Sequence, residues 1–314
     1  MHQAWSHMPL VSIITPSFNQ ALYLEQTIQS VLAQDSPSLE YIIVDGGSTD
    51  GSLDIIRKHA NQLAWWVSEP DSGQADALNK GLQRASGEVV AWLNSDDLYL
   101  PGAVSAAVQA LEANPAAGMV FGDAVTIDEK GTELNPLVFG NWGLQELMRF
   151  RIICQPAVFM RRAALEEAGY LDPAYHFLLD HLLWIQIARR SPVCHVAACW
   201  AAARHHPAAK NVRQAAGFGQ EAFRILQWMQ AQPDLQPQLK KDRLRIEAGA
   251  YRLNARYLLD GGQPAESLRS YLSALWRSPR FTLQHWRRML YALASLAGAG
   301  SLAERYSHRR LPTL

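Results

Sequence analysis

Val89-Val-Ala-Trp-Leu-Asn-Ser-Asp-Asp97 is the stretch that decides the fold, because an apolar run ends there in two adjacent carboxylates. The apolar part is short and rich in β-branched residues, which is typical of a strand buried on both faces of a parallel sheet. Ligands of open α/β sheets bind outside the carboxyl ends of the strands, and paired carboxylates there suit Mg²⁺ or Mn²⁺ carrying a diphosphate. We therefore expect a metal-diphosphate site at Asn94 to Asp97. The alternative is that either aspartate caps a helix over 98–111, with Pro101 near its start.

Three strand and helix pairs precede this stretch. Apolar runs over 10–15, 41–44 and 63–67 predict strands, and a segment with helical character follows each of them. The repeated βα order predicts an α/β protein with a parallel sheet and helical crossovers, so four carboxyl ends meet at one edge. Carboxylates follow three of these strands: Asp45, Asp71 with Asp76, and Asp96 with Asp97. Their convergence favours a ligand rich in hydroxyls, phosphates and donor N–H groups.

Asp45 is a candidate acceptor for a ring N–H of a pyrimidine base, and Gly46 and Gly47 leave room for a base or ribose. The alternative is a turn residue that stabilises its own loop. Neither a P-loop nor G-x-G-x-x-G occurs, and the segment from Asp45 to Asp50 lacks the terminal glutamate of a calcium loop. These absences disfavour a P-loop or dinucleotide-binding fold and a calcium site of that type.

Four motifs lie in order within residues 9–125: Pro9-Leu-Val-Ser-Ile-Ile-Thr-Pro-Ser-Phe-Asn19, Ile43-Val-Asp-Gly-Gly-Ser-Thr-Asp-Gly51, Asn79-Lys-Gly81 and Asn94-Ser-Asp-Asp97. Together they resemble the nucleotide-sugar-binding half of family 2 glycosyltransferases, which have the Rossmann-like GT-A fold with a mostly parallel sheet. The resemblance implies transfer of a sugar, with inversion, from a nucleoside diphosphate to an acceptor hydroxyl, with uridine favoured as the nucleoside. The family often has aspartate where this chain has Gly46 and Asn94.

The resemblance also implies roles for individual residues. Nucleotide binding falls to Pro16, Ser17, Asn19, Asp45, Asp76, Lys80, Asn94 and Ser95. The resemblance implies that Asp96 binds a Mg²⁺ or Mn²⁺ ion, with Asp97 and His206 as further ligands. His206 lies in Arg204-His-His-Pro-Ala-Ala-Lys210, which is similar to the family segment that closes over the diphosphate. Because a histidine in a polar loop is more often a plain surface residue, that second role stays an alternative.

The segment after Gly122 changes to short elements and loops, where we expect the acceptor site. Asp128-Glu-Lys-Gly131 predicts a hairpin turn. Gln155-Pro-Ala-Val-Phe-Met-Arg-Arg162 predicts an edge strand that leads into a helix, and another helix is expected from about Leu178. The family carries an acidic pair near this helix whose second acid is the catalytic base, which implies that role for Asp180. The alternative is that Asp180 only interacts favourably with the helix dipole.

These patterns predict a GT-A domain over 1–213, with a donor half over 9–125 and an acceptor half over 126–213, and a helical extension over 214–314. Apolar residues at helical spacing on both sides of Asp260-Gly-Gly262 predict two antiparallel helices, similar to one tetratricopeptide-type unit. A third helix over 281–297 has apolar residues and arginines: Trp286, Leu290 and Leu293 with Arg287 and Arg288. It suits a membrane surface, and the alternative is a helix buried against the catalytic domain or a second subunit.

The 314 residues carry no formal net charge, but residues 277–314 hold seven arginines and one glutamate, a charge of +6. Such a tail suggests an anionic surface or a solvated helix face. Three cysteines without zinc-type pairs fit a reducing compartment. No signal peptide and no apolar run of about 18 residues is evident. We expect a cytoplasmic protein, at the inner face of the membrane if it binds one, with a saccharide or lipid-linked acceptor and no nucleic-acid partner.

Two rival functions remain at this point. A sugar nucleotidyltransferase would need a glycine-rich phosphate loop with arginine near the N-terminus, and Thr15-Pro-Ser-Phe-Asn19 is not one. A non-catalytic carbohydrate- or partner-binding protein on a transferase scaffold is favoured by Gly46, Asn94 and Leu179, where the family often has acids. The joint presence of Asp45, Asp96, Asp180 and His206 argues against it.

Overall fold

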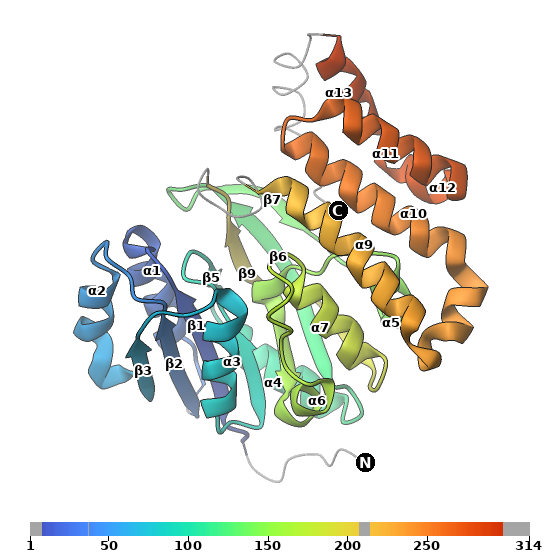
Figure 1. Ribbon diagram of the computed structural model, residues 1–314. Coiled ribbons are helices and arrows are strands. Elements are labelled where there is room, and N and C mark those ends of the chain that lie inside the picture. Colours follow the sequence, from blue (N-terminus) through green and yellow to red (C-terminus); the bar gives the residue numbers. More distant parts are fainter. Residues whose placement is uncertain (1–7, 37, 207–213, 298–314) are drawn as a thin grey trace. The chain divides into compact units, whose positions relative to one another are not determined.

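The computed structural model describes residues 8–36, 38–206 and 214–297 and divides into two compact units (Figure 1). The first consists of Met1–Gly143 and Ile153–His205, and the second of Leu144–Ile152 and His206–Leu314. The sequence places the change at residue 214 and does not anticipate that residues 144–152 belong with the helical unit. Each unit is described by itself below.

The first unit begins with the expected alternation of strands and helices. Its elements are β1 (Val11–Ser17), α1 (Ala21–Leu32), β2 (Leu39–Asp45), α2 (Ser52–His59), β3 (Trp65–Ser68), α3 (Gln74–Arg84) and β4 (Val89–Trp92). The strands pair in parallel in the order β3-β2-β1-β4. Right-handed crossovers put α1 and α2 on one face of this sheet and α3 on the other, since the chain reverses direction after β3 (Figure 1).

Burial explains why the deciding stretch forms a strand. Every side chain of β4 is at most 1% exposed. Burying one such Val side chain contributes about 1.5–3 kcal/mol relative to leaving it exposed. The reversal of strand order between β1 and β4 makes their carboxyl ends a topological switch point, which is where ligands of open α/β sheets bind.

The rest of the first unit completes a mixed sheet. Its elements are β5 (Leu98–Tyr99), α4 (Ala103–Ala113), β6 (Met119–Ile127), β7 (Glu133–Leu137), a 3₁₀ turn η2 (Gln155–Ala157), β8 (Val158–Arg161), α6 (Arg162–Ala168), α7 (Leu179–Ala188) and β9 (Val193–Arg204). The order continues β4-β8-β6-β9-β5, with β7 paired to β6. The hairpin expected at Asp128–Gly131 is confirmed, because β6 and β7 pair antiparallel across it.

Two local predictions are wrong. The helix expected over 98–111 begins only at Ala103, because Leu98–Tyr99 pairs with β9 as a short strand and Gly102, at φ 78°, precedes the helix. The strand expected at an edge near Val158 is internal, since β8 pairs with both β4 and β6. All four of its residues are buried, which an edge strand would not require.

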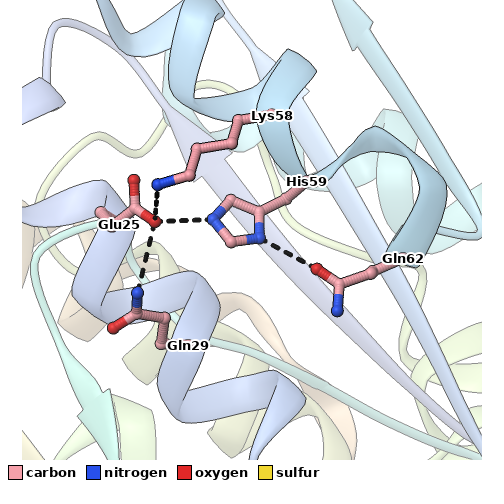
Figure 2. Close-up of polar contacts among 5 residues, drawn as sticks. All are labelled: Glu25, Gln29, Lys58, His59 and Gln62. Atoms are coloured by element: carbon pink, nitrogen blue, oxygen red, sulfur yellow. Dashed lines mark hydrogen bonds and ion pairs between the residues drawn. The ribbon is translucent and has the colours of Figure 1, made fainter.

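Helices α1 and α2 are joined by a polar cluster on their surfaces (Figure 2). Glu25 of α1 accepts hydrogen bonds from Lys58 Nζ at 3.0 Å and Gln29 Nε2 at 3.3 Å, and lies 2.7 Å from His59 Nε2. The other ring nitrogen of His59 lies 3.0 Å from Gln62 Oε1. Hydrogen bonds from His59 and Lys58 lower the pKa of Glu25. The cluster links the two helices through side chains alone.

The second unit is helical. It contains α5 (Leu144–Met148), α9 (Ala215–Ala231), α10 (Gln236–Asp260), α11 (Pro264–Arg277), α12 (Pro279–Thr282) and α13 (Trp286–Leu296). The antiparallel pair expected around Asp260-Gly-Gly262 is confirmed as α10 and α11, whereas the third expected helix is interrupted and continues as α13. No helix within the described residues is both long and apolar enough to cross a bilayer.

Candidate functional site

Four strands deliver polar side chains to one edge of the sheet. Ser17, Asp45 and Ser68 lie side by side in register at the ends of β1, β2 and β3. The turn from Asn94 to Asp97 follows β4, which is the other neighbour of β1. The predicted donor-site residues of the first unit therefore gather at the carboxyl edge of the sheet, on both sides of the switch point.

Asp45 is fully buried and holds its own loop together. Its Oδ2 accepts hydrogen bonds from Gly47 N at 3.1 Å, Ser48 N at 2.9 Å and Ser68 Oγ at 2.7 Å. Its Oδ1 accepts one from Ser48 Oγ at 2.5 Å. This is the geometry of the loop-stabilising alternative. Among the described residues Oδ1 accepts this single hydrogen bond, one fewer than the about two that a carboxylate oxygen can accept.

The loops after β1 and β2 are tied to each other through Asn19. Its backbone is left-handed at φ 52°, a conformation that asparagine tolerates better than most residues. Its Oδ1 accepts a hydrogen bond from Thr49 N at 2.9 Å, and its own N–H donates to Ser48 Oγ at 2.8 Å. The neighbouring Ser17 hydroxyl is buried and has no hydrogen-bond partner among the described residues. Asn19 therefore shapes the loops, and Ser17 retains an unused polar group.

The loop after β3 and the helix α3 that follows it both carry charged side chains. Lys80 pairs with Glu69 at 2.5 Å, and the pKa of Lys80 is raised by this hydrogen bond and by the nearby charges of Glu69, Asp76 and Asp71. Asp76 Oδ2 accepts a hydrogen bond from Ser72 N at 3.0 Å at the start of α3. Its position in the first turn also suits the helix dipole. Lys80, Asp71 and Asp76 thus form one electrostatic neighbourhood.

The amide of Asn94 is held from three sides. Its Oδ1 accepts from Gln74 Nε2 at 2.8 Å, while its Nδ2 donates to Gln155 Oε1 at 3.1 Å and to Asp97 Oδ2 at 3.3 Å. Gln155 also donates to Trp92 O at 2.7 Å. An aspartate at position 94 could accept from Gln74 but could not donate to Asp97. The chain therefore uses the amide to connect the turn after β4 with α3 and η2.

Asp97 and Asp96 differ in their surroundings. Asp97 is 6% exposed, and its Oδ1 accepts the Arg204 N–H at 2.9 Å. Burial and the neighbouring charge of Asp96 raise the pKa of Asp97 well above its ordinary value, against the opposing effect of the Arg204 N–H. Asp96 is half-buried and is held at its backbone, where its carbonyl accepts from Arg204 Nε at 2.9 Å.

Arg204 is the residue that fixes this turn. The residue is 5% exposed, and its guanidinium donates to Asp96 O at 2.9 Å and to Asp128 O and Glu129 O at 3.0 Å each. Its Nη2 donates to Gln26 Oε1 at 2.8 Å. The guanidinium carbon also lies 4.8 Å from the centre of the Tyr23 ring, within cation–π range. One side chain therefore fastens the turn after β4 to the β6–β7 turn and to α1.

The other predicted residues are distributed as follows. Asp180 is half-buried in the first turn of α7, with its Oδ1 accepting His181 N at 2.7 Å. Burial, followed by the charges of Asp97 and Asp180, raises the pKa of the Cys154 thiol well above its ordinary value. Pro16 and Ser95 are buried. His206 is buried and belongs to the second unit.

The carboxylates at this edge suit a cation that is shared with substrate phosphates, and not a cation enclosed by protein side chains alone. Within the described ranges, no group of three or more His, Cys, Asp and Glu side chains lies close enough to hold a metal ion. Mg²⁺ and its analogues, however, are commonly held by one or two carboxylates together with substrate phosphates. Asp96 fits that arrangement, while Asp97 has hydrogen bonds to both of its oxygens.

Sequence reasoning missed four residues of this edge: Phe18, Gln74, Gln155 and Arg204. Phe18 is 61% exposed although it is aromatic and lies between predicted ligands, so its position within the first motif was a usable signal. The two glutamines gave no local signal, because their partners lie far away in the sequence. Arg204 opens the recognised segment Arg204–Lys210, but only His206 of that segment was given a role.

Comparison with known proteins agrees with the geometry. The family model described as glycosyl transferase family 2 matches residues 12–168, which is half of the chain. The chain belongs to this family. Among curated relatives, the putative teichuronic acid biosynthesis glycosyltransferase TuaG of Bacillus subtilis is 49% identical over 94 residues, covering 29% of this chain and 37% of TuaG. The chain spans about a third of the length of the first curated relatives that it matches.

Solved structures show the same fold at low sequence identity. TarS 1–349 of S. aureus in complex with UDP-GlcNAc has a TM-score of 0.59 at 16% identity, with 95% of this chain and 91% of that chain covered. The mannosyltransferase PcManGT of Pyrobaculum calidifontis, in complex with GDP-Man and Mn²⁺, has a TM-score of 0.60 at 21% identity, with 96% and 88% covered. The α/β fold of the GT-A type with a C-terminal helical region is confirmed.

Proposed function

We propose that this family 2 chain is a metal-dependent glycosyltransferase that moves a sugar from a nucleoside diphosphate, uridine first among the candidates, to an acceptor hydroxyl with inversion. The observation that carries the proposal is the set of carboxylates at one edge of the parallel sheet: Asp45 ends β2 and Asp96 follows β4, the two strands that flank β1. TuaG, named for teichuronic acid biosynthesis, supports a role in cell-surface glycan synthesis.

Asp180 and Asp96 have different proposed roles in the reaction. The bond from the anomeric carbon to the diphosphate breaks, a bond to the acceptor oxygen forms, and the acceptor's proton passes to the Asp180 carboxylate. A divalent cation held by Asp96, with Asp97 as a further candidate ligand, would offset the charge that develops on the leaving diphosphate. Arg204 holds the backbone of Asp96, so its contribution is to keep that carboxylate in place.

Asp45 remains the proposed acceptor for the nucleobase, through the capacity left on Oδ1. Pro16, Ser17 and Asn19 support the nucleoside side of the site, Asp76 and Lys80 lie next to it, and Asn94 and Ser95 lie at the turn that carries Asp96. TarS and PcManGT were solved with different nucleotides, UDP-GlcNAc and GDP-Man, so both UDP and GDP donors belong in the first screen.

The test separates the base from the cation ligand. Asp180→Asn should release nucleoside diphosphate from the donor about 10²–10⁴-fold more slowly, with donor affinity unchanged, because only the proton acceptor is lost. Asp96→Asn should abolish the Mn²⁺-dependent part of UDP binding measured by calorimetry. Asp54→Asn is the matched control, because Asp54 is an exposed aspartate of α2 that pairs with Arg57.

Two outcomes contradict these assignments. If Asp180→Asn loses donor affinity and keeps its turnover at saturation, Asp180 is a binding residue. If the wild-type chain binds UDP with Mn²⁺ but releases no nucleotide from any donor in the presence of saccharide and lipid-linked acceptors, the non-catalytic alternative replaces the transferase.

The second unit is proposed to make a peripheral contact with an anionic membrane. Trp286, Leu290 and Leu293 recur at helical spacing on α13 and are 50–53% exposed, with exposed Arg287 beside them. Arg288 is paired with Asp260 at 2.9 Å, so of the two arginines of α13 it is the exposed Arg287 that we expect to meet lipid phosphates. Each basic residue near an anionic surface contributes about 1 kcal/mol.

Co-sedimentation measures this contact. Wild type should sediment with vesicles that contain an anionic phospholipid at low salt and stay in solution with purely zwitterionic vesicles. Arg287→Glu should weaken that binding about fivefold or more, and high salt should do the same. Concentration-dependent dimerisation without vesicle binding would instead assign this helix face to a second copy of the chain.

A further inference from the structure

The helical unit contains a buried arginine that has no carboxylate partner among the described residues. Arg252 of α10 is 6% exposed. Its Nη2 donates to Phe150 O at 3.0 Å, and its Nη1 lies 2.9 Å from His285 Nε2. A guanidinium has five N–H donors, so three of those of Arg252 have no acceptor in the described part of the chain. A buried charge is ordinarily paired, because taking it out of water is costly.

Further arginines surround the same place. The Phe281 ring lies next to two of them, since the guanidinium carbons of Arg252 and Arg151 lie 4.7 Å and 5.9 Å from its centre. Burial is the first cause that lowers the pKa of His285 to about 2, and it is followed by the charges of four arginines: Arg252, Arg256, Arg288 and Arg151. Several guanidinium groups therefore act on one small region of the unit.

The acidic side chains near this region do not balance Arg252. They pair with other arginines of the unit: Asp260 with Arg288 and Arg256, and Glu146 and Asp242 with Arg149. Arg151 is only partly buried, and its Nη2 donates to the exposed Gln284 side chain at 3.3 Å. The arginines around Phe281 thus extend from the interior at Arg252 to the surface at Arg151.

We infer that these arginines bind a phosphate group beside Phe281, with Arg252 and Arg151 as its ligands. Phosphate oxygens accept from the planar fork of a guanidinium through two parallel hydrogen bonds, which suits the unused donors of Arg252. A dianionic phosphate also supplies the negative charge that the described acids do not. All of these residues belong to the helical unit, so the inference does not depend on sugar transfer.

Two sources can supply this phosphate group: a soluble phosphate ester and the headgroup of a phospholipid. The second source would add to the proposed membrane contact, because the half-exposed Trp286 of α13 directly follows His285 in the sequence. Phosphatidic acid carries a phosphate monoester, as a soluble ester does, whereas phosphatidylglycerol carries a diester with a single charge. The two lipids therefore separate binding of a monoester from general attraction to an anionic surface.

Thermal unfolding of the full chain tests binding of phosphate itself, with EDTA present so that no divalent cation takes part. About 5 mM inorganic phosphate should raise the Tm of wild type by about 2 °C or more over chloride at the same ionic strength, because a ligand that binds only the folded state stabilises it. Arg252→Gln and Arg151→Gln should lose this increase. Arg243→Gln should keep it, because Arg243 is an exposed arginine of α10 that pairs with Glu247.

Arg151→Gln keeps the test decisive if Arg252→Gln does not fold, because Arg151 lies partly at the surface. Co-sedimentation of the same variant distinguishes the two sources. If the headgroup is the ligand, wild type should bind vesicles with phosphatidic acid about fivefold or more tightly than phosphatidylglycerol vesicles of equal charge. Arg151→Gln should remove this preference. If the two vesicles bind alike while the increase in Tm is present, the ligand is a soluble phosphate ester.

Two results would overturn the inference. If phosphate does not raise the Tm of wild type above that in chloride, the helical unit has no phosphate site. If the increase is the same in wild type, Arg151→Gln and Arg252→Gln, it is a general salt effect or comes from another part of the chain. None of these measurements involves a sugar donor, so a failure of the proposed transferase activity leaves them unchanged.

Discussion

Two buried arginines, one in each unit, look alike and have different consequences. Arg204 is 5% exposed and stacks 4.8 Å from Tyr23, while Arg252 is 6% exposed and stacks 4.7 Å from Phe281. Arg204 donates to three backbone carbonyls and to the Gln26 side chain, which belong to three segments: the turn after β4, the β6–β7 turn and α1. Its charge is therefore spread over neutral acceptors that belong to the turns around the site.

Arg252 lies in a more positive environment. It donates to Phe150 O at 3.0 Å and to the ring of His285 at 2.9 Å, with further arginines nearby. Burial, followed by the charge of Arg151, lowers the pKa of Arg252 to about 9. Burial and then Arg252 itself, with Arg256, Arg288 and Arg151, lower the pKa of His285 to about 2. A buried guanidinium thus fixes the turn of the candidate site in one unit and secures packing at an electrostatic cost in the other.

The largest expected effect comes from removing the side chains of Arg204 and Arg252, one at a time, and Arg204 comes first. Arg204→Met leaves four oxygens without their donor, so the free energy of unfolding should fall by about 3 kcal/mol or more. Where the variant folds, Asp96 loses its support and should shift. A displacement of about 1 Å at a reacting site typically costs about 10²-fold, so the rate of sugar transfer should fall by that factor. Denaturant unfolding and donor turnover measure the two effects.

Two companion variants sharpen this result. Arg204→Lys keeps the charge without the planar fork of donors, so it should restore part of the stability and little of the turnover. Arg252→Met should change stability and leave UDP affinity and turnover as in wild type. If Arg252→Met slows transfer as much as Arg204→Met, the distinction between a positioning arginine and a packing arginine is lost.

Acid should affect the helical unit through His285. The folded pKa lies near 2, below the ordinary value of 6.5, so the unfolded chain binds more protons between these values and stability falls as the pH drops below about 6.5. The loss is about 1.4 kcal/mol per pH unit, or about 2 kcal/mol at pH 5. His285→Gln, which can still accept from Arg252, should remove most of this dependence.

Urea unfolding at pH 7 and at pH 5, followed by circular dichroism of wild type and of His285→Gln, measures the effect. If wild type and His285→Gln lose the same free energy of unfolding between pH 7 and pH 5, groups other than His285 cause the loss. The electrostatic difference between the surroundings of Arg252 and Arg204 would then have no support.

The comparison also explains how much the sequence could predict. Strands β1, β2 and β4 followed from apolar runs, because a strand buried on both faces needs only local apolar residues. The twelve-residue strand β9 was missed, since its alanine-rich sequence is only partly buried and its pairing with β6 is non-local. The positions of the acidic motifs could also be predicted, because these motifs come directly after the ends of the predicted strands.

The contacts that hold those motifs could not be predicted. Arg204 meets partners 75 to 178 residues away, so nothing near it in the sequence indicates its role. Gly46 was recognised as a departure from the family pattern, but the contact that a Cβ atom there would make with Asp71 requires knowledge of how the loops after β2 and β3 approach each other. Long-range side-chain contacts of this kind depend on the assembled sheet.

The smallest expected effect belongs to the exposed cluster of Figure 2, which is the surface counterpart of the two buried arginines. Glu25 is 28% exposed and Lys58 66% exposed, so water and salt screen their attraction. Glu25→Gln should lower the free energy of unfolding by less than about 1 kcal/mol, and high salt should shrink the difference further. The pKa of Glu25 is lowered in the fold, so this contribution is present above its unfolded pKa and is lost as the pH falls through the folded one. A loss as large as that of Arg204→Met would mean that burial does not decide the energetic weight of charged contacts in this chain.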